Sequence, residues 1–202
     1  MTNLSEIHPF RKALFFFCLA IFSYFYLDRE LLLHLSPTLK PFSKGLTYLI
    51  FPPFHLVFWG LLFIIMRLRK SIWTLPLFET IVSQCLSVAF VRTAKVFIGR
   101  ARPTIYLKKG IYGFHGFEWD HHYHSFPSGH TLMIFTLATS LSLAFPKWRI
   151  PLFTLATLLS LSRVLLAKHY LSDVLGTAAI GIIIATFVHL IVRRTHWNFL
   201  AR

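Results

Sequence analysis

The sequence predicts an all-α, polytopic membrane protein with six transmembrane helices and a candidate active site at one membrane face. Hydrophobic residues make up 55% of the 202 positions, charged residues make up only 14%, and the mean hydropathy is +0.62. A soluble domain carries about 25% charged residues, and a disordered chain needs low hydrophobicity. Both classes are therefore excluded. The apolar residues gather in six segments, and the polar residues capable of chemistry fall in the gaps on one side.

Each apolar segment is near the length of about 20 residues that crosses a bilayer, although the first and fourth are short. Backbone groups in lipid must be satisfied within the segment, so each segment is predicted to be a helix. The first follows Arg11 and Lys12 but has no small-residue cleavage site after it, which favours a retained span over a signal peptide. Pro52 and Pro53 predict a kink in the second. The segments cover residues 13–27, 46–66, 72–91, 131–145, 150–166 and 174–192.

No internal repeat is visible, so one membrane domain, residues 1–202, accounts for the chain. The charge balance is basic, with 21 Lys and Arg against 7 Asp and Glu, a formal net charge of +14. Nucleic acid is not the expected partner, because most basic residues lie in short gaps between apolar segments. Basic loops and an anionic lipid ligand explain both the charge and the hydropathy. Cys18 and Cys85 lie in apolar segments, so no disulfide is expected.

Three polar clusters interrupt the apolar pattern. The first is Lys95 followed by Arg102-Pro103, and the second is Pro127-Ser128-Gly129-His130 just before the fourth segment. The third is Ser162-Arg163, His169 and Asp173, between the fifth and sixth segments. The third and fifth spans end on the face where the fourth and sixth begin. All three clusters are therefore predicted on one side of the membrane.

The residue types suit the chemistry of phosphate. Lys95, Arg102 and Arg163 supply three cations, and arginine grips phosphate oxygens through two parallel hydrogen bonds. Ser128 is a plausible helix N-cap, and Gly129 lets the backbone N–H groups of that helix start approach an anion.

The histidines suit transfer of a phosphoryl group. His169 and Asp173 are four residues apart and would face each other on one helix. An aspartate held against one ring nitrogen fixes the tautomer and leaves the other nitrogen free to attack. His130 is then available as general acid and base. The clusters together predict phosphoryl transfer through a covalent phosphohistidine at His169. No nucleotide-binding loop or acidic magnesium cluster is evident, so no cofactor or metal is expected.

The three clusters, in this order, resemble the signature motifs of the type 2 phosphatidic acid phosphatase (PAP2) superfamily, with every signature position matched between residues 95 and 173. The resemblance implies a metal-independent phosphatase with the site at the membrane surface. His169 corresponds to the nucleophile, Asp173 to its partner and His130 to the general acid. Phosphate binding is implied for Lys95, Arg102, Ser128, Gly129 and Arg163. Soluble vanadate-dependent haloperoxidases share the motifs, but six apolar segments favour the integral-membrane branch.

The predicted function is hydrolysis of a phosphomonoester or diphosphate of a membrane lipid. The candidates are undecaprenyl diphosphate, lipid A phosphate, phosphatidylglycerol phosphate and phosphatidate. A lipid phosphotransferase using the same phosphohistidine and a non-enzymatic transporter or scaffold remain alternatives. The expected partners are the lipid and the bilayer, and the oligomeric state is open. Lys and Arg divide almost evenly between the two faces, ten against eleven. The very short loops on the side of the termini favour cytoplasmic termini and a periplasmic site in a bacterial inner membrane.

The gap before the fourth segment holds a histidine cluster: His115, His121, His122 and His124. A zinc site is one interpretation, but the spacing fits no common zinc pattern, and the aromatic residues favour an interfacial layer. Glycines at every third position, Gly110, Gly113 and Gly116, suggest a mobile lid. Arg100, Lys108 and Lys109 are expected to anchor the loop at the interface or to contact further anionic groups.

Overall fold

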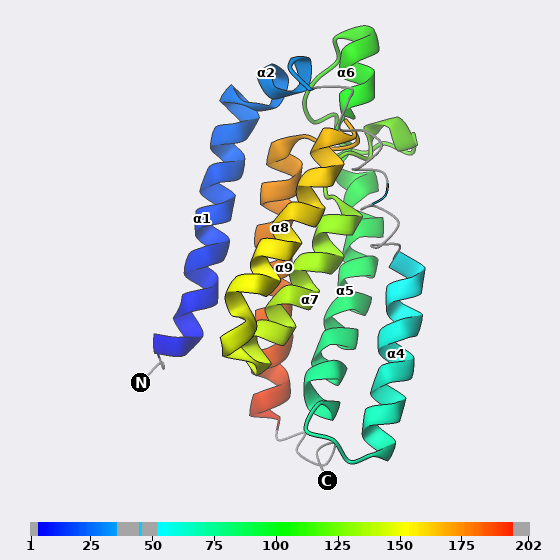
Figure 1. Cartoon of the computed structure of the whole chain (residues 1–202). Helices are drawn as coiled ribbons and strands as arrows, with labels where there is room; N and C mark the ends of the chain where they lie inside the picture. The colour runs from blue at the N-terminus through cyan, green and yellow to red at the C-terminus, as the bar shows by residue number, and fades with distance from the viewer. Residues whose placement is uncertain (1–3, 36–44, 46–51, 196–202) are drawn as a thin grey trace.

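The computed structural model describes residues 4–35, 45 and 52–195, and all regular elements in these residues are helical. Six longer helices run alternately up and down the bundle (Figure 1). They are α1 (Leu4–Tyr26), α4 (Pro52–Leu68), α5 (Thr74–Ile98), α7 (Gly129–Ala144), α8 (Arg149–Leu165) and α9 (Leu171–Arg194). Short helices connect them: α2 (Asp28–Leu33), α6 (Pro103–Lys109), and the 3₁₀ turns η2 (His121–Tyr123) and η3 (Pro146–Trp148).

Among the described residues, four helices are long and apolar enough to cross a membrane. They are Pro9–Tyr26, Thr74–Ile98, Pro146–Leu165 and Leu171–Arg194, whereas the apolar parts of α4 and α7, Leu56–Leu68 and Gly129–Ala144, are shorter. Large apolar side chains on the outer faces, such as Phe15, Leu61 and Phe187, are exposed, as a lipid-facing surface requires. An all-helical membrane protein is therefore confirmed, while six crossing helices remain a prediction.

One predicted segment end differs clearly from its helix. Helix α5 runs on past residue 91 to Ile98, so Lys95 belongs to its last turn and not to the following gap. The apolar pattern ends where the side chains leave the hydrocarbon, but the backbone hydrogen bonds continue. The described part of α4 begins at Pro52, so the kink at Pro52 and Pro53 stays a prediction. Residues 46–51 of the predicted second span lie outside the described residues.

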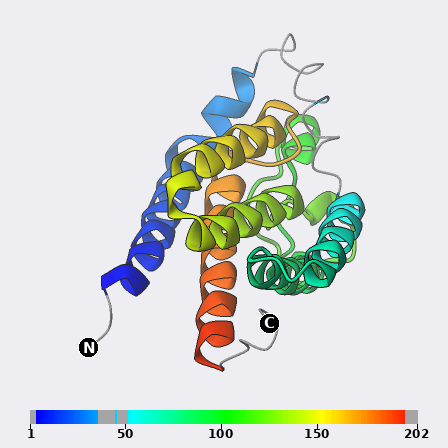
Figure 2. The same ribbon diagram turned by 60° about the horizontal axis from the view of Figure 1, so that its bottom comes forward.

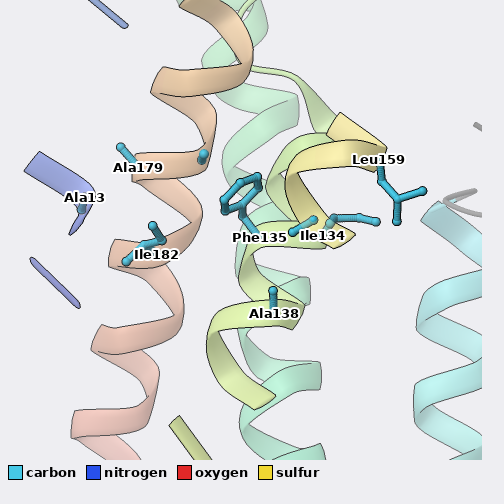
Figure 3. Close-up of a cluster of buried hydrophobic side chains, with 9 residues drawn as sticks. Ala13, Ile134, Phe135, Ala138, Leu159, Ala179 and Ile182 are labelled. Carbon is cyan, nitrogen blue, oxygen red and sulfur yellow. The ribbon is translucent and has the colours of Figure 1, made fainter. Parts of the chain in front are cut away.

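Helices α7 and α9 form the centre of the bundle. Figure 2 shows them between α1 on one side and α4 on the other. The Phe135 side chain points from α7 toward Ala179 and Ile182 of α9 (Figure 3). A Cβ added to Gly181 of α9 would lie 3.0 Å from the Phe135 Cβ and 3.3 Å from the carbonyl oxygen of Leu132. Small residues thus let these two helices approach closely, which is how helices gain packing energy in a membrane.

The start of α1 and the end of α9 lie at the same end of the bundle (Figure 1). Helices α2 and α6 lie at the opposite end, together with the loop that precedes α7. The alternation of six antiparallel helices therefore brings the ends of α5 and α8 to the same level as the starts of α7 and α9. This is the level at which the three polar clusters meet.

A bulky side chain at Gly181 is expected to destabilise the bundle, because the backbone of α7 cannot move away from it. We expect Gly181→Val to cost about 1–3 kcal/mol, as overpacking does in other cores. Thermal unfolding in detergent measures the loss. Gly60→Val in α4 is the matched control, since nothing lies within 4 Å of a Cβ there. Equal melting temperatures for the two variants would contradict the close packing of α7 on α9.

Candidate active site

Six of the eight residues singled out in the sequence line one cavity of about 510 Å³ at the α6 end of the bundle. Helix α5 contributes Lys95, α7 contributes Gly129 and His130 from its first turn, and α8 contributes Arg163 from its last. Arg102 and His169 come from the segments that lead into α6 and α9. Ser128 and Asp173 are fully buried in the wall behind these residues.

The turn after α8 places His169 beside Arg163. The N–H of Lys168 bonds the carbonyl oxygen of Arg163 at 3.1 Å, and the N–H of Ala167 bonds that of Val164 at 2.8 Å. This is the Schellman arrangement, which requires a left-handed residue after the helix, and Ala167 has a φ of 50°. The chain therefore reverses at once, and the N–H of His169 also reaches the Arg163 carbonyl, at 3.4 Å.

The hydrogen bonds of His169 fix its tautomer. Its Nδ1 lies 2.6 Å from the carbonyl oxygen of Ser125. A carbonyl oxygen only accepts, so neutral His169 carries its hydrogen on Nδ1 and keeps the lone pair on Nε2. Only 4% of His169 is exposed, and it lines the cavity. Burial, followed by the charges of Lys95, Arg163 and Arg102, holds the pKa of His169 well below its ordinary value. The ring is thus neutral at physiological pH.

Asp173 does not hydrogen-bond the imidazole directly. Its Oδ2 lies 3.8 Å from His169 Nδ1. His169 precedes the N-cap residue Tyr170, so the prediction that both residues face each other on one helix is wrong: only Asp173 is helical. Asp173 Oδ2 instead accepts hydrogen bonds from Ser125 Oγ at 2.6 Å and from the Tyr170 N–H at 2.8 Å. Ser125 therefore connects the carboxylate to the ring, through its hydroxyl on one side and its carbonyl on the other.

The sequence pattern did not reveal where Arg100 lies. It was expected at the interface, but it is only 1% exposed. Its Nη1 donates to Asp173 Oδ1, and its Nη2 donates to Asp28 Oδ2 at 2.7 Å. The guanidinium also lies 5.0 Å from the ring centroids of Tyr24 and Phe114. Burial lowers the pKa of Arg100, but Asp173 and Asp28 more than offset this and raise it above its ordinary value.

Asp28 ties the first helices to the last one. Its carboxylate accepts hydrogen bonds from the Ser172 N–H at 2.9 Å, from Ser23 Oγ at 2.9 Å and from Tyr112 Oη at 3.1 Å. The Ser172 hydroxyl is a further donor. The sequence offered one weak signal for this residue: an acid directly after an apolar segment in a chain with only 7 acidic residues. Its partner Arg100 is 72 residues away, so pattern alone does not connect them.

Ser128 occupies the predicted N-cap position of α7, but its side chain makes no capping hydrogen bond. Its hydroxyl accepts from Thr131 Oγ1 at 3.1 Å, and its N–H donates to Thr177 Oγ1 at 2.9 Å. The first N–H groups of a helix have no carbonyl one turn earlier. Gly129 and His130, the first two residues of α7, therefore bring the positive end of the helix dipole to the cavity wall.

The loop before α7 is held by backbone hydrogen bonds to residues 96–102, so it forms a docked rim in this structure, and the mobile lid stays a prediction. The N–H groups of Ala101 and Arg102 donate to loop carbonyls, and loop N–H groups donate back to Val96, Ile98, Gly99 and Arg100. Gly99 permits this docking: its φ is 52°, and a Cβ there would lie 2.0 Å from the carbonyl oxygen of Gly116.

The loop histidines do not converge on one point. His124 lines the active-site cavity, and its Nε2 lies 2.9 Å from the Glu118 carbonyl oxygen. Among the described residues, one group could share a metal ion: Asp120, His121 and His122, whose ligand atoms all lie within 4.8 Å of one another. All three side chains are exposed, and they lie outside the cavity that contains His169.

The comparisons with known proteins agree with the motifs. A family model described as PAP2 superfamily matches residues 76–197. A lipid A 1-phosphatase of Rhizobium etli is 34% identical over 105 residues, which cover 52% of this chain and 44% of that protein. A lipid A 4'-phosphatase of Porphyromonas gingivalis is 27% identical over 188 residues, 84% of this chain and 75% of that protein. The chain thus spans less than half the length of the Rhizobium relative.

Two crystal structures share the fold. A transmembrane PAP2-type phosphatidylglycerolphosphate phosphatase of Bacillus subtilis has a TM-score of 0.65 and 22% identity, covering 95% of this chain and 98% of that one. Aquifex aeolicus LpxE has a TM-score of 0.63 and 28% identity, covering 81% of this chain and 95% of that one.

Removing the Arg100 charge is expected to destabilise the protein strongly, because Asp28 and Asp173 would remain buried without their cation. We expect Arg100→Gln to cost about 3–5 kcal/mol, the usual effect of breaking a buried ion pair. Arg29→Gln is the matched control: Arg29 is exposed and lies 5.5 Å from the Tyr112 ring. Its loss should cost under about 1 kcal/mol. Unfolding in detergent measures both, and equal losses would refute the role of Arg100.

The buried neutral state of His169 predicts a dependence of stability on pH. Its pKa is lowered by folding, so the unfolded chain binds the extra proton near pH 6.5 and acid favours unfolding. The contribution of neutral His169 to the free energy of unfolding is thus complete above pH 6.5 and is lost as pH falls. Between pH 6.5 and 5, wild type should lose up to about 1.4 kcal/mol per pH unit more than His169→Gln. Unfolding midpoints measure this, with His34→Gln at an exposed site as control; parallel curves for wild type and His169→Gln would contradict it.

Proposed function

The chain belongs to the PAP2 superfamily, and we propose that it is a membrane lipid phosphate phosphatase that works through a phosphohistidine. One observation carries this proposal. A neutral imidazole, His169, lines a cavity with its hydrogen held on Nδ1, and three cations line the same cavity: Lys95, Arg102 and Arg163. A nucleophile needs a lone pair, and a phosphate group needs cations, so the two requirements meet in one place.

In the first step, the lone pair of His169 Nε2 forms a bond to phosphorus while the bond from phosphorus to the lipid oxygen breaks. Protonated His130 gives its proton to that oxygen, and the lipid leaves as an alcohol or a lower phosphate. Lys95, Arg102 and Arg163 neutralise the charge that spreads over the equatorial oxygens. The N–H groups at the start of α7 add hydrogen bonds to the same oxygens.

In the second step, His130 takes a proton from a water molecule. The water oxygen bonds to phosphorus as the bond from phosphorus to Nε2 breaks, which releases inorganic phosphate and returns His169 to its neutral form. Between the steps the phosphorylated ring carries a positive charge. The Ser125 carbonyl then accepts a hydrogen bond from its Nδ1–H. Asp173, 3.8 Å from Nδ1, lowers the energy of that state as a nearby negative charge.

The substrate we propose is a phosphorylated glycolipid of the lipid A type. Two relatives act on lipid A by their names, and one of them matches 84% of this chain. The cavity extends from Lys95 down α5 to Val88 and Ser87, with Met133 of α7 beside them. Eight residues of helix span about 12 Å, so the cavity has room for a headgroup and the first part of an acyl chain.

We further propose that all six longer helices cross the membrane, with the termini in the cytoplasm and the site on the periplasmic face of a bacterial inner membrane. Helices α4 and α7 are short for a span, but α7 lies in the centre of the bundle, where protein and not lipid surrounds it. The end of the bundle with α6 carries the cations that meet the phosphate.

The test is phosphate release by purified protein in detergent, with a chelator present. The panel contains lipid A phosphate, undecaprenyl diphosphate, phosphatidylglycerol phosphate and phosphatidate. Wild type should release phosphate, with lipid A phosphate the best substrate, and His169→Ala should lose at least about 10³-fold in kcat, as loss of a covalent nucleophile does. His34→Ala, at an exposed site at the end of α2, is the control.

The outcomes separate the alternatives. If no inorganic phosphate is released, and the phosphoryl group of the donor lipid appears on an added acceptor lipid, the protein is a phosphotransferase. A functional readout unchanged in His169→Ala would support a transporter or scaffold and refute the phosphohistidine. Strong inhibition by the chelator would contradict a metal-independent reaction and direct attention to Asp120, His121 and His122.

A further inference from the structure

A second cavity, of about 430 Å³, lies on the same face of the protein as the active-site cavity. Arg102 lines both cavities, so one side chain forms part of a shared wall. The second cavity is lined by a group of basic side chains from three separate segments: Arg102, Lys108, Lys109, Lys168, His121 and His122. Its cations converge through the fold and do not form a single basic run in the sequence.

Hydrogen bonds hold the walls of this cavity in place. The Arg102 N–H donates to the His122 carbonyl at 3.0 Å, and Arg102 Nε donates to the His121 carbonyl at 2.9 Å. The start of α6 is thereby tied to η2. Within the described residues, Arg102 donates no other side-chain hydrogen bond, so its two terminal nitrogens remain for a ligand. Lys168 belongs to the turn that positions His169, which connects the third segment to the nucleophile.

The charge in the cavity favours an anion. Arg102 and three lysines contribute four positive charges, and Asp120 is the one acidic residue in the lining, which leaves a net charge of +3 with the histidines neutral. The Asp120 carboxylate already accepts a hydrogen bond from the His122 N–H at 2.9 Å. That bond, with smaller effects from the nearby histidines, lowers the pKa of Asp120. A concave wall focuses the field of such charges more than a flat surface does.

We propose that the second cavity binds a second anionic group of the same lipid headgroup whose scissile phosphate lies against His169. The ligand chemistry is a phosphate, and the site selects substrates that carry two of them. Arg102 contacts both groups from the shared wall, while Lys108, Lys109 and Lys168 contact only the second. This inference rests on the proposed function, which it deepens by naming the substrate class.

The test compares two lipids with the same chains, one with a single headgroup phosphate and one with two phosphates at separate positions. The variants are Lys108→Gln/Lys109→Gln and Lys168→Gln, and the control is Lys147→Gln, an exposed lysine at the opposite end of the bundle. We define the preference as kcat/KM for the lipid with two phosphates divided by kcat/KM for the lipid with one. This preference should fall roughly tenfold in the double lysine variant, because two charge-assisted contacts are lost. The change should come from KM. The control should keep the wild-type ratio.

Equilibrium binding of both lipids to the same variants separates the failure of this inference from the failure of the proposed function. In one outcome, wild type turns over neither lipid and still binds the lipid with two phosphates more tightly than the lipid with one. If the lysine variants lose that binding preference, the phosphatase is refuted and the second site is kept. Equal losses for both lipids, or an unchanged ratio, would overturn the second site.

Two further arms identify other ligands of the cavity. If inorganic phosphate changes wild-type turnover of the lipid with one phosphate, and the double lysine variant does not respond, the cavity binds free phosphate and the headgroup assignment is wrong. Zn²⁺ is the second probe. If wild type binds Zn²⁺, the His121→Gln/His122→Gln variant does not, and bound Zn²⁺ abolishes the preference for two phosphates, the cavity is a metal site.

Discussion

A buried guanidinium between two carboxylates is the interaction on which the site depends. Taking a charge out of water costs several kcal/mol per ion, and the cost is recovered only when every partner is in place. Arg100 has Asp28 on one side, Asp173 on the other and aromatic rings around it. Asp173 in turn positions Ser125, whose carbonyl fixes the tautomer of His169. The orientation of His169 therefore depends on Arg100, a buried charge that acts through Asp173 and Ser125 and does not line the cavity.

The arrangement around His169 uses the same set of cations for two purposes. Burial, and after it the charges of Lys95, Arg163 and Arg102, lower the pKa of His169 in the empty site, because a further positive charge there is unfavourable. A phosphate between them changes this balance, since its negative charge then faces the ring. In the proposed mechanism, the imidazole thus keeps its lone pair in the empty site, and its positively charged product is stabilised in the occupied site.

The residues that the sequence identified are those whose charge is conspicuous between apolar segments. Lys95, Arg102, His130 and His169 were found in this way, and the antiparallel order of the helices brought them together as expected. The missed features have physical reasons. The Ser125 carbonyl is a backbone atom and has no sequence signature, and the expectation for Arg100 failed because charge alone does not reveal burial. Helix ends such as Ile98 were misjudged because hydropathy reports depth in the membrane and not hydrogen bonding.

The place of the Arg100 partners along the chain has a consequence for biosynthesis. Asp28 is made 72 residues before Arg100, and Asp173 follows 73 residues after it. During translation Arg100 can therefore pair with Asp28 early, but its second carboxylate, Asp173, is made only with the last helix. A chain truncated before α9 lacks Asp173 and the hydrogen bonds that Asp173 accepts from Ser125 and Tyr170. The candidate site and the completed fold thus depend on the same helix.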